Sequence, residues 1–120
     1  MPKYRVPQQI RNVVARAIAQ NLDRPISQRA AYKDVNGKRV AGTGMRTARR
    51  LLSGSVDEQQ LILMRSWFAR HGASPKEKKA RKDINSKASI AYRLWGGSQA
   101  IPFINGQLRA IEARRKKNKD

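Results

Sequence analysis

The chain has 120 residues, of which 27 are Lys or Arg and 8 are Asp or Glu, so its formal net charge is +19 at pH 7. A folded domain this basic repels itself, and the imbalance is typical of proteins that contact a polyanion. The absence of cysteine excludes disulfides, thiol catalysis and cysteine-based zinc sites. A hydrophobic share of 39% is enough for one modest core, so we expect one domain.

The sequence carries no sign of membrane insertion. No apolar stretch approaches the roughly 20 residues of a membrane span, and the N-terminal residues MPKYRVPQQ lack the apolar run of a signal peptide. We therefore expect a protein without a membrane partner that is not secreted through a signal peptide. It divides into a basic N-terminal arm at 1–6, one helical domain at 7–112 and a basic C-terminal tail at 113–120, with both termini flexible.

Residues 7–22 are expected to form the first helix. Pro7 suits the first helical position, where its missing N–H costs nothing. Pro25 forbids much extension beyond the other end. The apolar residues that recur at the spacing of one helix face are Ile10, Val13, Val14, Ala17 and Ile18.

The next segment carries a turn signal. Asn36-Gly37 stands between two short stretches that can pair across it, so residues 32–40 predict a small hairpin. Because these flanks are short and charged, an ordered loop is the alternative.

A second helix is expected from Thr43, as its cap, to Gly54, which suits a helix end. Ser55 and Glu58 have the spacing of a capping box, so they predict the start of a third helix that closes at Gly72. The positions expected to face inward on these two helices are Met45, Ala48, Leu51, Leu52, Leu61, Met64 and Phe68.

The last third of the chain begins with a charged stretch at 73–85, which we expect to be a solvated loop. Ser86 then caps a fourth helix that ends at Gly96-Gly97, and Pro102 opens a fifth. The expected fold is all-α: a single compact domain of four to five short helices.

Three segments follow one another along the chain: residues 42–49 (GTGMRTAR), 66–71 (SWFARH) and 86–97 (SKASIAYRLWGG). In this order they resemble a small domain family found in tailed-bacteriophage genomes, and the resemblance covers about residues 40–105. The chain departs from the family pattern at Ser98, where the family usually has an acid. The family has no settled activity, so the resemblance implies a phage setting and a compact helical domain. Within these motifs and the capping box we interpret as structural Gly42, Thr43, Ser55, Glu58, Phe68, His71, Trp95, Gly96 and Gly97.

No catalytic constellation stands out. The close acidic pair Asp57 and Glu58 is explained by helix capping, and His71 is the single histidine, so a metal would lack ligands. We expect no enzymatic activity, no metal and no cofactor. The segment Gly42–Gly44 is too short for a phosphate loop, although a helix start there can offer amides to one phosphate.

The aromatic residues have two interpretations. Trp67, Phe68, Tyr92 and Trp95 are of the kind that stack on bases. A small domain needs large aromatics inside, however, so we place Phe68 and Trp95 in the core.

The cations are the candidate binding residues. A helix-turn-helix around Gly54 is disfavoured, because Asp57 and Glu58 would face phosphates at the start of the reading helix. We place nucleic acid against the second helix, the loops and the tail instead. The candidates are Arg46, Arg49, Arg50, Arg65, Arg70, Lys78, Lys79, Arg81, Lys82, Lys87, Arg93, Arg114, Arg115, Lys116 and Lys117.

The function that these patterns favour is that of a phage-type accessory protein binding nucleic acid, DNA ahead of RNA, mostly nonspecifically through phosphates. It would act in the cytoplasm of an infected bacterium or in the virion. One alternative is a virion or head-assembly component that contacts packaged DNA, a phage head protein or an acidic host protein. The other is an inhibitor of a host nucleic-acid enzyme.

Overall fold

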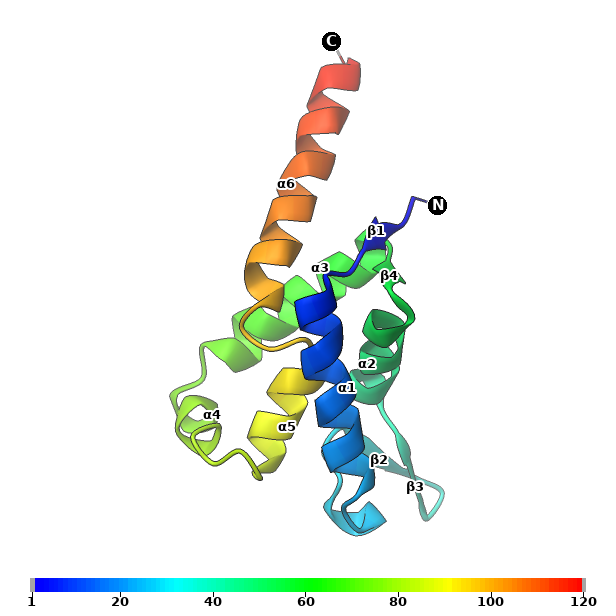
Figure 1. The fold of residues 1–120 in the computed structure, drawn as a ribbon, viewed down its shortest axis with the longest axis vertical. Helices are drawn as coiled ribbons and strands as arrows, with labels where there is room; N and C mark the ends of the chain where they lie inside the picture. Colours follow the sequence, from blue (N-terminus) through cyan, green and yellow to red (C-terminus); the bar gives the residue numbers. More distant parts are fainter. Residues whose placement is uncertain (1, 120) are drawn as a thin grey trace.

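In the computed structural model, which describes residues 2–119, the central helix α1 (Gln8–Leu22) packs against α2 (Thr43–Ser53) and α5 (Lys87–Leu94) (Figure 1). Their apolar residues recur every three or four positions, which brings them onto the faces that meet. Side chains with no exposed surface at this contact are Val14, Ala17, Met45, Ala48, Leu51, Ile90 and Leu94.

A second layer is formed by α3 (Glu58–Trp67), its π-helical continuation η2 (Phe68–Gly72) and α6 (Ala100–Lys119). Helices α3 and α6 contact each other, and Leu61, Met64, Ile104 and Ile111 are buried. The C-terminal part of α6 extends beyond the rest of the protein (Figure 1). It contributes to a long dimension of 54 Å against 30 and 27 Å across.

Within residues 2–119 the chain is mostly helical, with six α-helices and two small antiparallel sheets. The expected all-α class is therefore right for most of the chain, and the hairpin allowed at 32–40 is present. The prediction of four to five helices is one short, and it omitted the β1–β4 pair. One sheet pairs β1 with β4, and the other pairs β2 with β3. The bounds of the short elements are β1 Tyr4–Arg5, η1 Ile26–Gln28, β2 Tyr32–Val35, β3 Lys38–Ala41, β4 Ser55–Val56 and α4 Pro75–Ala80.

The hairpin prediction is confirmed. Strands β2 and β3 pair from Tyr32 with Ala41 to Val35 with Lys38. Asn36 and Gly37 both have positive φ, 51° and 79°, as the two-residue turn that matches strand twist requires. The first helix is likewise confirmed, over 8–22, although Pro7 is the residue that precedes the helix and not its first residue.

The N-terminal arm is attached rather than loose. Tyr4 pairs with Val56 across β1 and β4, and the N–H of Val6 donates to the carbonyl of Gly54 at 2.8 Å. The Val6 side chain is 2% exposed. Burial of this valine fixes residues 4–6 to the body.

The basic C-terminal tail is also ordered differently from the prediction. Residues 113–119 continue α6 without a break. Because no Gly or Pro follows Ile111, nothing in the sequence ends the helix there. The cations of this segment thus stand on one helix.

The capping box predicted at Ser55 is wrong. Ser55 and Val56 form β4, and Val56 is 2% exposed, so the helix begins two residues later than predicted. Asp57 is the cap, and its carboxylate accepts from the N–H of Gln60 at 2.9 Å. Glu58 then lies in the first turn, where its charge suits the helix dipole.

Two further details of α2 differ from the prediction. Gly42, not Thr43, precedes the helix, and its N–H donates to the carbonyl of Ala31 at 2.7 Å. A Cβ at position 42 would stand 2.9 Å from that carbonyl oxygen, so only glycine fits this approach. Leu52 is 38% exposed and does not face inward. Gly54 ends the helix in the left-handed conformation, as predicted.

We expect Asp57→Ala to lower the free energy of unfolding by about 1 kcal/mol, because the first turn of α3 loses its cap. Ser55→Ala should change it by no more than a few tenths, since Ser55 caps nothing. Urea denaturation of both variants measures the difference. An equal loss in the two variants would instead favour the capping box at Ser55.

Candidate nucleic-acid interface

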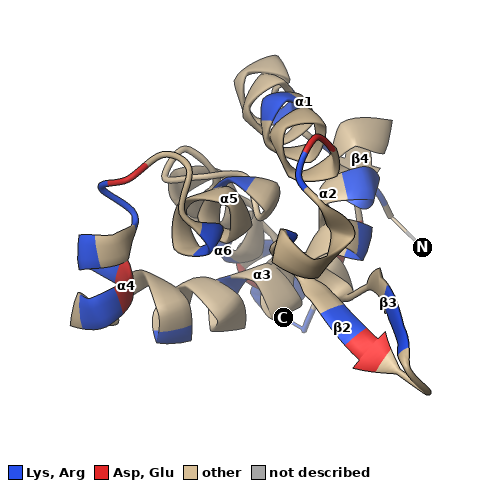
Figure 2. Ribbon diagram, turned by 90° about the horizontal axis from the view of Figure 1, so that it is seen from below, with Lys and Arg blue, Asp and Glu red and all other residues tan. Residues whose placement is uncertain are grey.

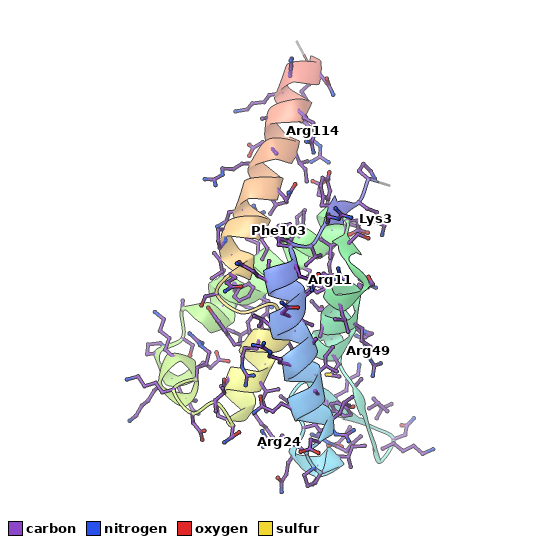
Figure 3. All side chains as sticks on the ribbon, viewed as in Figure 1. Lys3, Arg11, Arg24, Arg49, Phe103 and Arg114 are labelled. Carbon is purple, nitrogen blue, oxygen red and sulfur yellow. The ribbon has the colours of Figure 1, made fainter. Side chains whose placement is uncertain are left out.

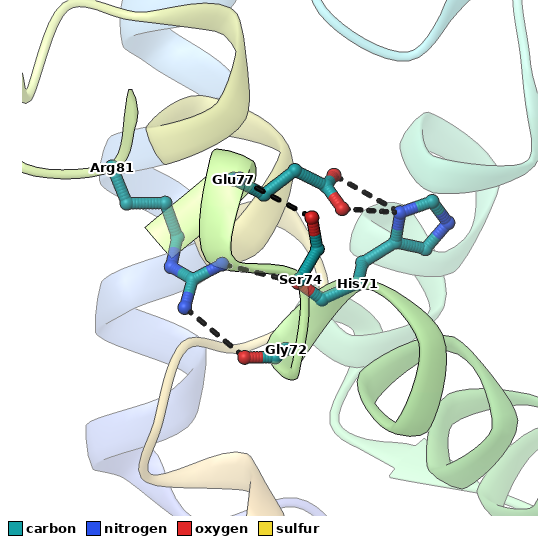
Figure 4. A network of polar contacts seen from close by, with 5 residues as sticks. All are labelled: His71, Gly72, Ser74, Glu77 and Arg81. Carbon is teal, nitrogen blue, oxygen red and sulfur yellow. Dashed lines mark hydrogen bonds and ion pairs between the residues drawn. The ribbon is translucent and has the colours of Figure 1, made fainter. Parts of the chain in front are cut away.

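The charged segment at 73–85 is an ordered unit rather than a solvated loop, and Figure 4 shows the contacts that order it. Ser74 caps α4 by accepting from the N–H of Glu77 at 3.3 Å, and Pro75 follows at the first helical position. The Glu77 carboxylate lies 3.0 and 3.1 Å from Nδ1 of His71. His71 therefore joins η2 to α4, which is consistent with a structural role.

Arg81 has a structural role in the same unit. Its guanidinium donates to the carbonyl oxygens of His71 and Gly72 at 3.2 and 3.4 Å. It also lies over the ring of Tyr92, 4.2 Å from the centroid (Figure 4 shows the hydrogen bonds). A candidate phosphate-binding residue thus uses its charge to close the end of η2 onto α5.

Arg93 is half-buried and also hydrogen-bonded within the fold. It donates to Oγ of Ser89 at 3.3 Å and to the carbonyl of Ile84 at 2.8 Å. Burial lowers the pKa of Arg93, but the side chain remains a cation at pH 7. Its role here is to hold the segment before α5 against the helix.

Four other candidate arginines have partners inside the protein yet remain exposed. Arg50 donates to Oε1 of Gln60 at 2.7 Å. Arg115 binds both carboxylate oxygens of Glu58, which raises the pKa of Arg115. Arg46 contacts Thr43 and the carbonyl of Ala41, and Arg114 contacts the hydroxyl of Tyr4.

The side chains of the remaining candidates are exposed and make no hydrogen bond or ion pair within residues 2–119. Figure 3 shows Arg49 on the outer side of α2, and Figure 2 shows cations on α4, α5, α2 and the hairpin, at different places around the view. The structure does not gather them on one face. They are Arg49, Arg65, Arg70, Lys78, Lys79, Lys82, Lys87, Lys116 and Lys117.

Few of the basic side chains are neutralised by acids. Between residues 2 and 119, three Lys or Arg side chains lie within 4.0 Å of a carboxylate: Lys3 at Asp57, Arg39 at Asp34 and Arg115 at Glu58. The excess charge therefore stands on the surface largely uncompensated, and each exposed cation remains available to a phosphate.

The aromatic side chains are engaged within the fold. Trp95 and Phe68 are buried, 3% and 7% exposed, as predicted. Trp67 stacks on Trp95 with centroids 4.9 Å apart and also lies 4.8 Å from the His71 ring. Tyr92 holds Arg81 over its ring and a hydrogen bond to Ser98. This arrangement does not favour base stacking by these residues.

Two other possible anion sites are closed. The start of α3 holds Lys3 at Asp57 and Arg115 at Glu58, so it does not present a reading helix. The start of α2 is covered as well, because Gly42 and Gly44 are buried beside Ala31. Phosphate contacts must come from side chains rather than from these helix termini.

No group of three His, Asp or Glu side chains within the described part of the chain is placed to hold a metal ion. Helices in the same part of the chain are too short or too polar to cross a bilayer.

The sequence prediction omitted the hairpin cations. Lys33 and Lys38 are exposed and lie on β2 and β3. Their positions follow from strand alternation around the Asn36-Gly37 turn, because side chains along a strand point to opposite faces in turn. The hairpin interpretation of residues 32–40 therefore carries the signal that could have found them.

Comparison with known proteins found no matching protein family, no matching curated protein and no matching solved structure.

Proposed function

We propose that this chain is a small phage-type accessory protein that binds nucleic acid, DNA ahead of RNA, mostly through phosphates and with little sequence preference. The observation that carries the proposal is the uncompensated surface charge. The chain has a net charge of +19, yet among residues 2–119 three Lys or Arg side chains have a carboxylate within 4.0 Å. Phosphate contacts carry no base information, so binding of this kind is nearly sequence-independent.

One feature supports duplex DNA over a single strand. Proteins that bind single strands stack successive bases on exposed aromatic rings. In this fold Phe68 and Trp95 are buried, and Trp67 and Tyr92 are half-buried with their rings packed against other aromatic rings. The phage setting rests on the three sequence motifs at 42–49, 66–71 and 86–97, which resemble a phage domain family.

Fluorescence anisotropy over a salt series tests the function. The labelled probes are a DNA duplex, a DNA single strand and a structured RNA, all of unrelated sequence. We expect tightest binding to the duplex, with a slope of log affinity against log salt of about −5 if six phosphates are contacted. Absence of binding at micromolar protein and about physiological salt would overturn the proposal. The surface would then be assigned to an acidic protein, which a pull-down from infected cells would identify.

A further inference from the structure

The β2–β3 hairpin projects from the body of the protein. In Figures 1 and 2, seen from directions at right angles, its turn points away from the helices. Its main neighbour besides itself is the start of α2, which follows β3 directly. The ribbon is therefore accessible along one side and at its tip.

Register divides the hairpin into two faces. Directly opposed residues of an antiparallel pair lie on one face, and neighbours along a strand alternate. Tyr32 with Ala41 and Asp34 with Arg39 thus form one face. Tyr32, Arg39 and Ala41 are half-buried, and Arg39 lies 3.7 Å from Asp34, so this face is the inner one and holds the hairpin's acid.

The outer face is made of the other two pairs, Lys33 with Val40 and Val35 with Lys38. All four side chains are exposed, with Val35 and Val40 at 43% and 37%. Two cations therefore flank two branched apolar side chains, with no acid among them. We refer to these four residues as the outer face.

This composition matches one surface of nucleic acid. The major groove of B-DNA is about 12 Å wide and admits a two-stranded ribbon, whereas the minor groove is about 6 Å wide. Two strands about 4.8 Å apart, with side chains added, fit the major groove of B-DNA without deforming it, whereas the undeformed minor groove is too narrow for them. The major groove also presents thymine methyl groups between rows of phosphates, which suits apolar side chains flanked by cations.

We propose that the outer face of the hairpin enters the major groove of duplex DNA. Lys33 and Lys38 bind phosphates or guanine edges, and Val35 and Val40 contact thymine methyl groups. This inference rests on the proposed function and adds to it a docking element, a groove and a modest preference for thymine.

The test compares two duplexes of alternating sequence, one of adenine and thymine and one of adenine and uracil. They differ in the C5 methyl group and carry the same charge. We expect the unaltered protein to bind the uracil duplex roughly tenfold more weakly, if each valine loses about one buried methyl contact. The Val35→Ser/Val40→Ser variant should bind both duplexes equally.

A lysine pair completes the design. Lys33→Gln/Lys38→Gln should reduce the magnitude of the salt slope by about 2. Lys78→Gln/Lys79→Gln removes the same charge from α4 and should keep the thymine preference. All the altered residues are exposed. Circular dichroism with thermal melting is the check that each variant folds.

The outcomes separate this inference from the function beneath it. Steep salt dependence on the duplex, with no difference between thymine and uracil and no effect of the valine pair, would overturn the hairpin assignment and leave nucleic-acid binding standing. Binding to single strands alone would do the same. Failure to bind any of the nucleic acids would overturn both.

Discussion

Gly96→Ala is expected to destabilise the protein by about 3 kcal/mol, the sum of a left-handed backbone cost and an overpacking cost. Gly96 has φ of +108°, and a Cβ there would stand 2.8 Å from Cβ of Ala100 and 3.1 Å from Cγ2 of Ile10. Both neighbours are buried, at 0% and 2% exposed, and belong to α6 and α1. The added methyl would therefore push apart helices from both layers.

Two other glycines separate the contributions. Gly37 also has positive φ, +79°, but a Cβ there would have no neighbour within 4 Å, so Gly37→Ala measures the backbone cost alone, about 1 kcal/mol. Gly106 lies inside α6 with no neighbour within 4 Å, and Gly106→Ala should stabilise by up to about 1 kcal/mol. Urea denaturation of the three variants gives the comparison. If Gly96→Ala cost no more than Gly37→Ala, the close approach at Gly96 would be contradicted.

Local sequence signals predicted the elements whose boundaries depend on local chemistry. The apolar spacing of α1, the Asn36-Gly37 turn and the glycine after α2 each act within a few residues. Tertiary packing seldom overrides such signals. Few residues other than glycine and asparagine adopt the positive φ that these turns need, and the spacing of apolar residues alone decides which face of α1 can be buried.

The capping-box pattern occurs twice in the chain, and a tertiary contact determines which of the two serines caps a helix. Ser55 and Ser74 are each followed three residues later by Glu, the capping-box pattern. Ser74 caps α4, whereas Ser55 is drawn into a strand because Tyr4 pairs with Val56. That pairing joins segments 52 residues apart by number, so no local pattern indicates it.

The sequence predicts that the candidate interface is cationic, but it does not predict which cations the interface contains. Composition indicates a cationic surface, yet it does not tell which cations the fold uses for itself. Arg81 and Arg93 bind backbone carbonyls that lie within reach, and such partners depend on three-dimensional packing. Lysines such as Lys78 and Lys79 remain exposed without partners among residues 2–119. The guanidinium offers five donors in a fixed fork, which suits it to bind such carbonyls, but Arg49, Arg65 and Arg70 remain exposed without side-chain partners among residues 2–119, so residue type alone does not decide.

The largest functional effect is expected from the end of α6. Lys116→Gln/Lys117→Gln/Lys119→Gln removes three exposed cations from the part of the helix that extends beyond the body (Figure 1). If each contacts a phosphate, the salt slope falls in magnitude by about 3, and affinity for duplex DNA at about 0.1 M salt falls by two orders of magnitude or more. Glutamine is a good helix former, so α6 should persist. Anisotropy titrations over a salt series measure both quantities.

The matched control is Lys78→Gln/Lys79→Gln/Lys82→Gln. It removes the same charge from two residues of α4 and from Lys82, the second residue after that helix. Each set has two acids nearby in the sequence, Glu77 and Asp83 for the α4 set and Glu112 and Asp120 for the α6 set. The α6 set lies on the part of the helix that extends beyond the body (Figure 1), where the rest of the protein does not obstruct a duplex, so the α4 variant should lose less affinity. A smaller loss in the α6 variant than in the α4 variant would place the DNA on the α4 side. An unchanged slope in both would contradict phosphate contacts by lysine at either place, because removing a contacting cation necessarily releases fewer counterions.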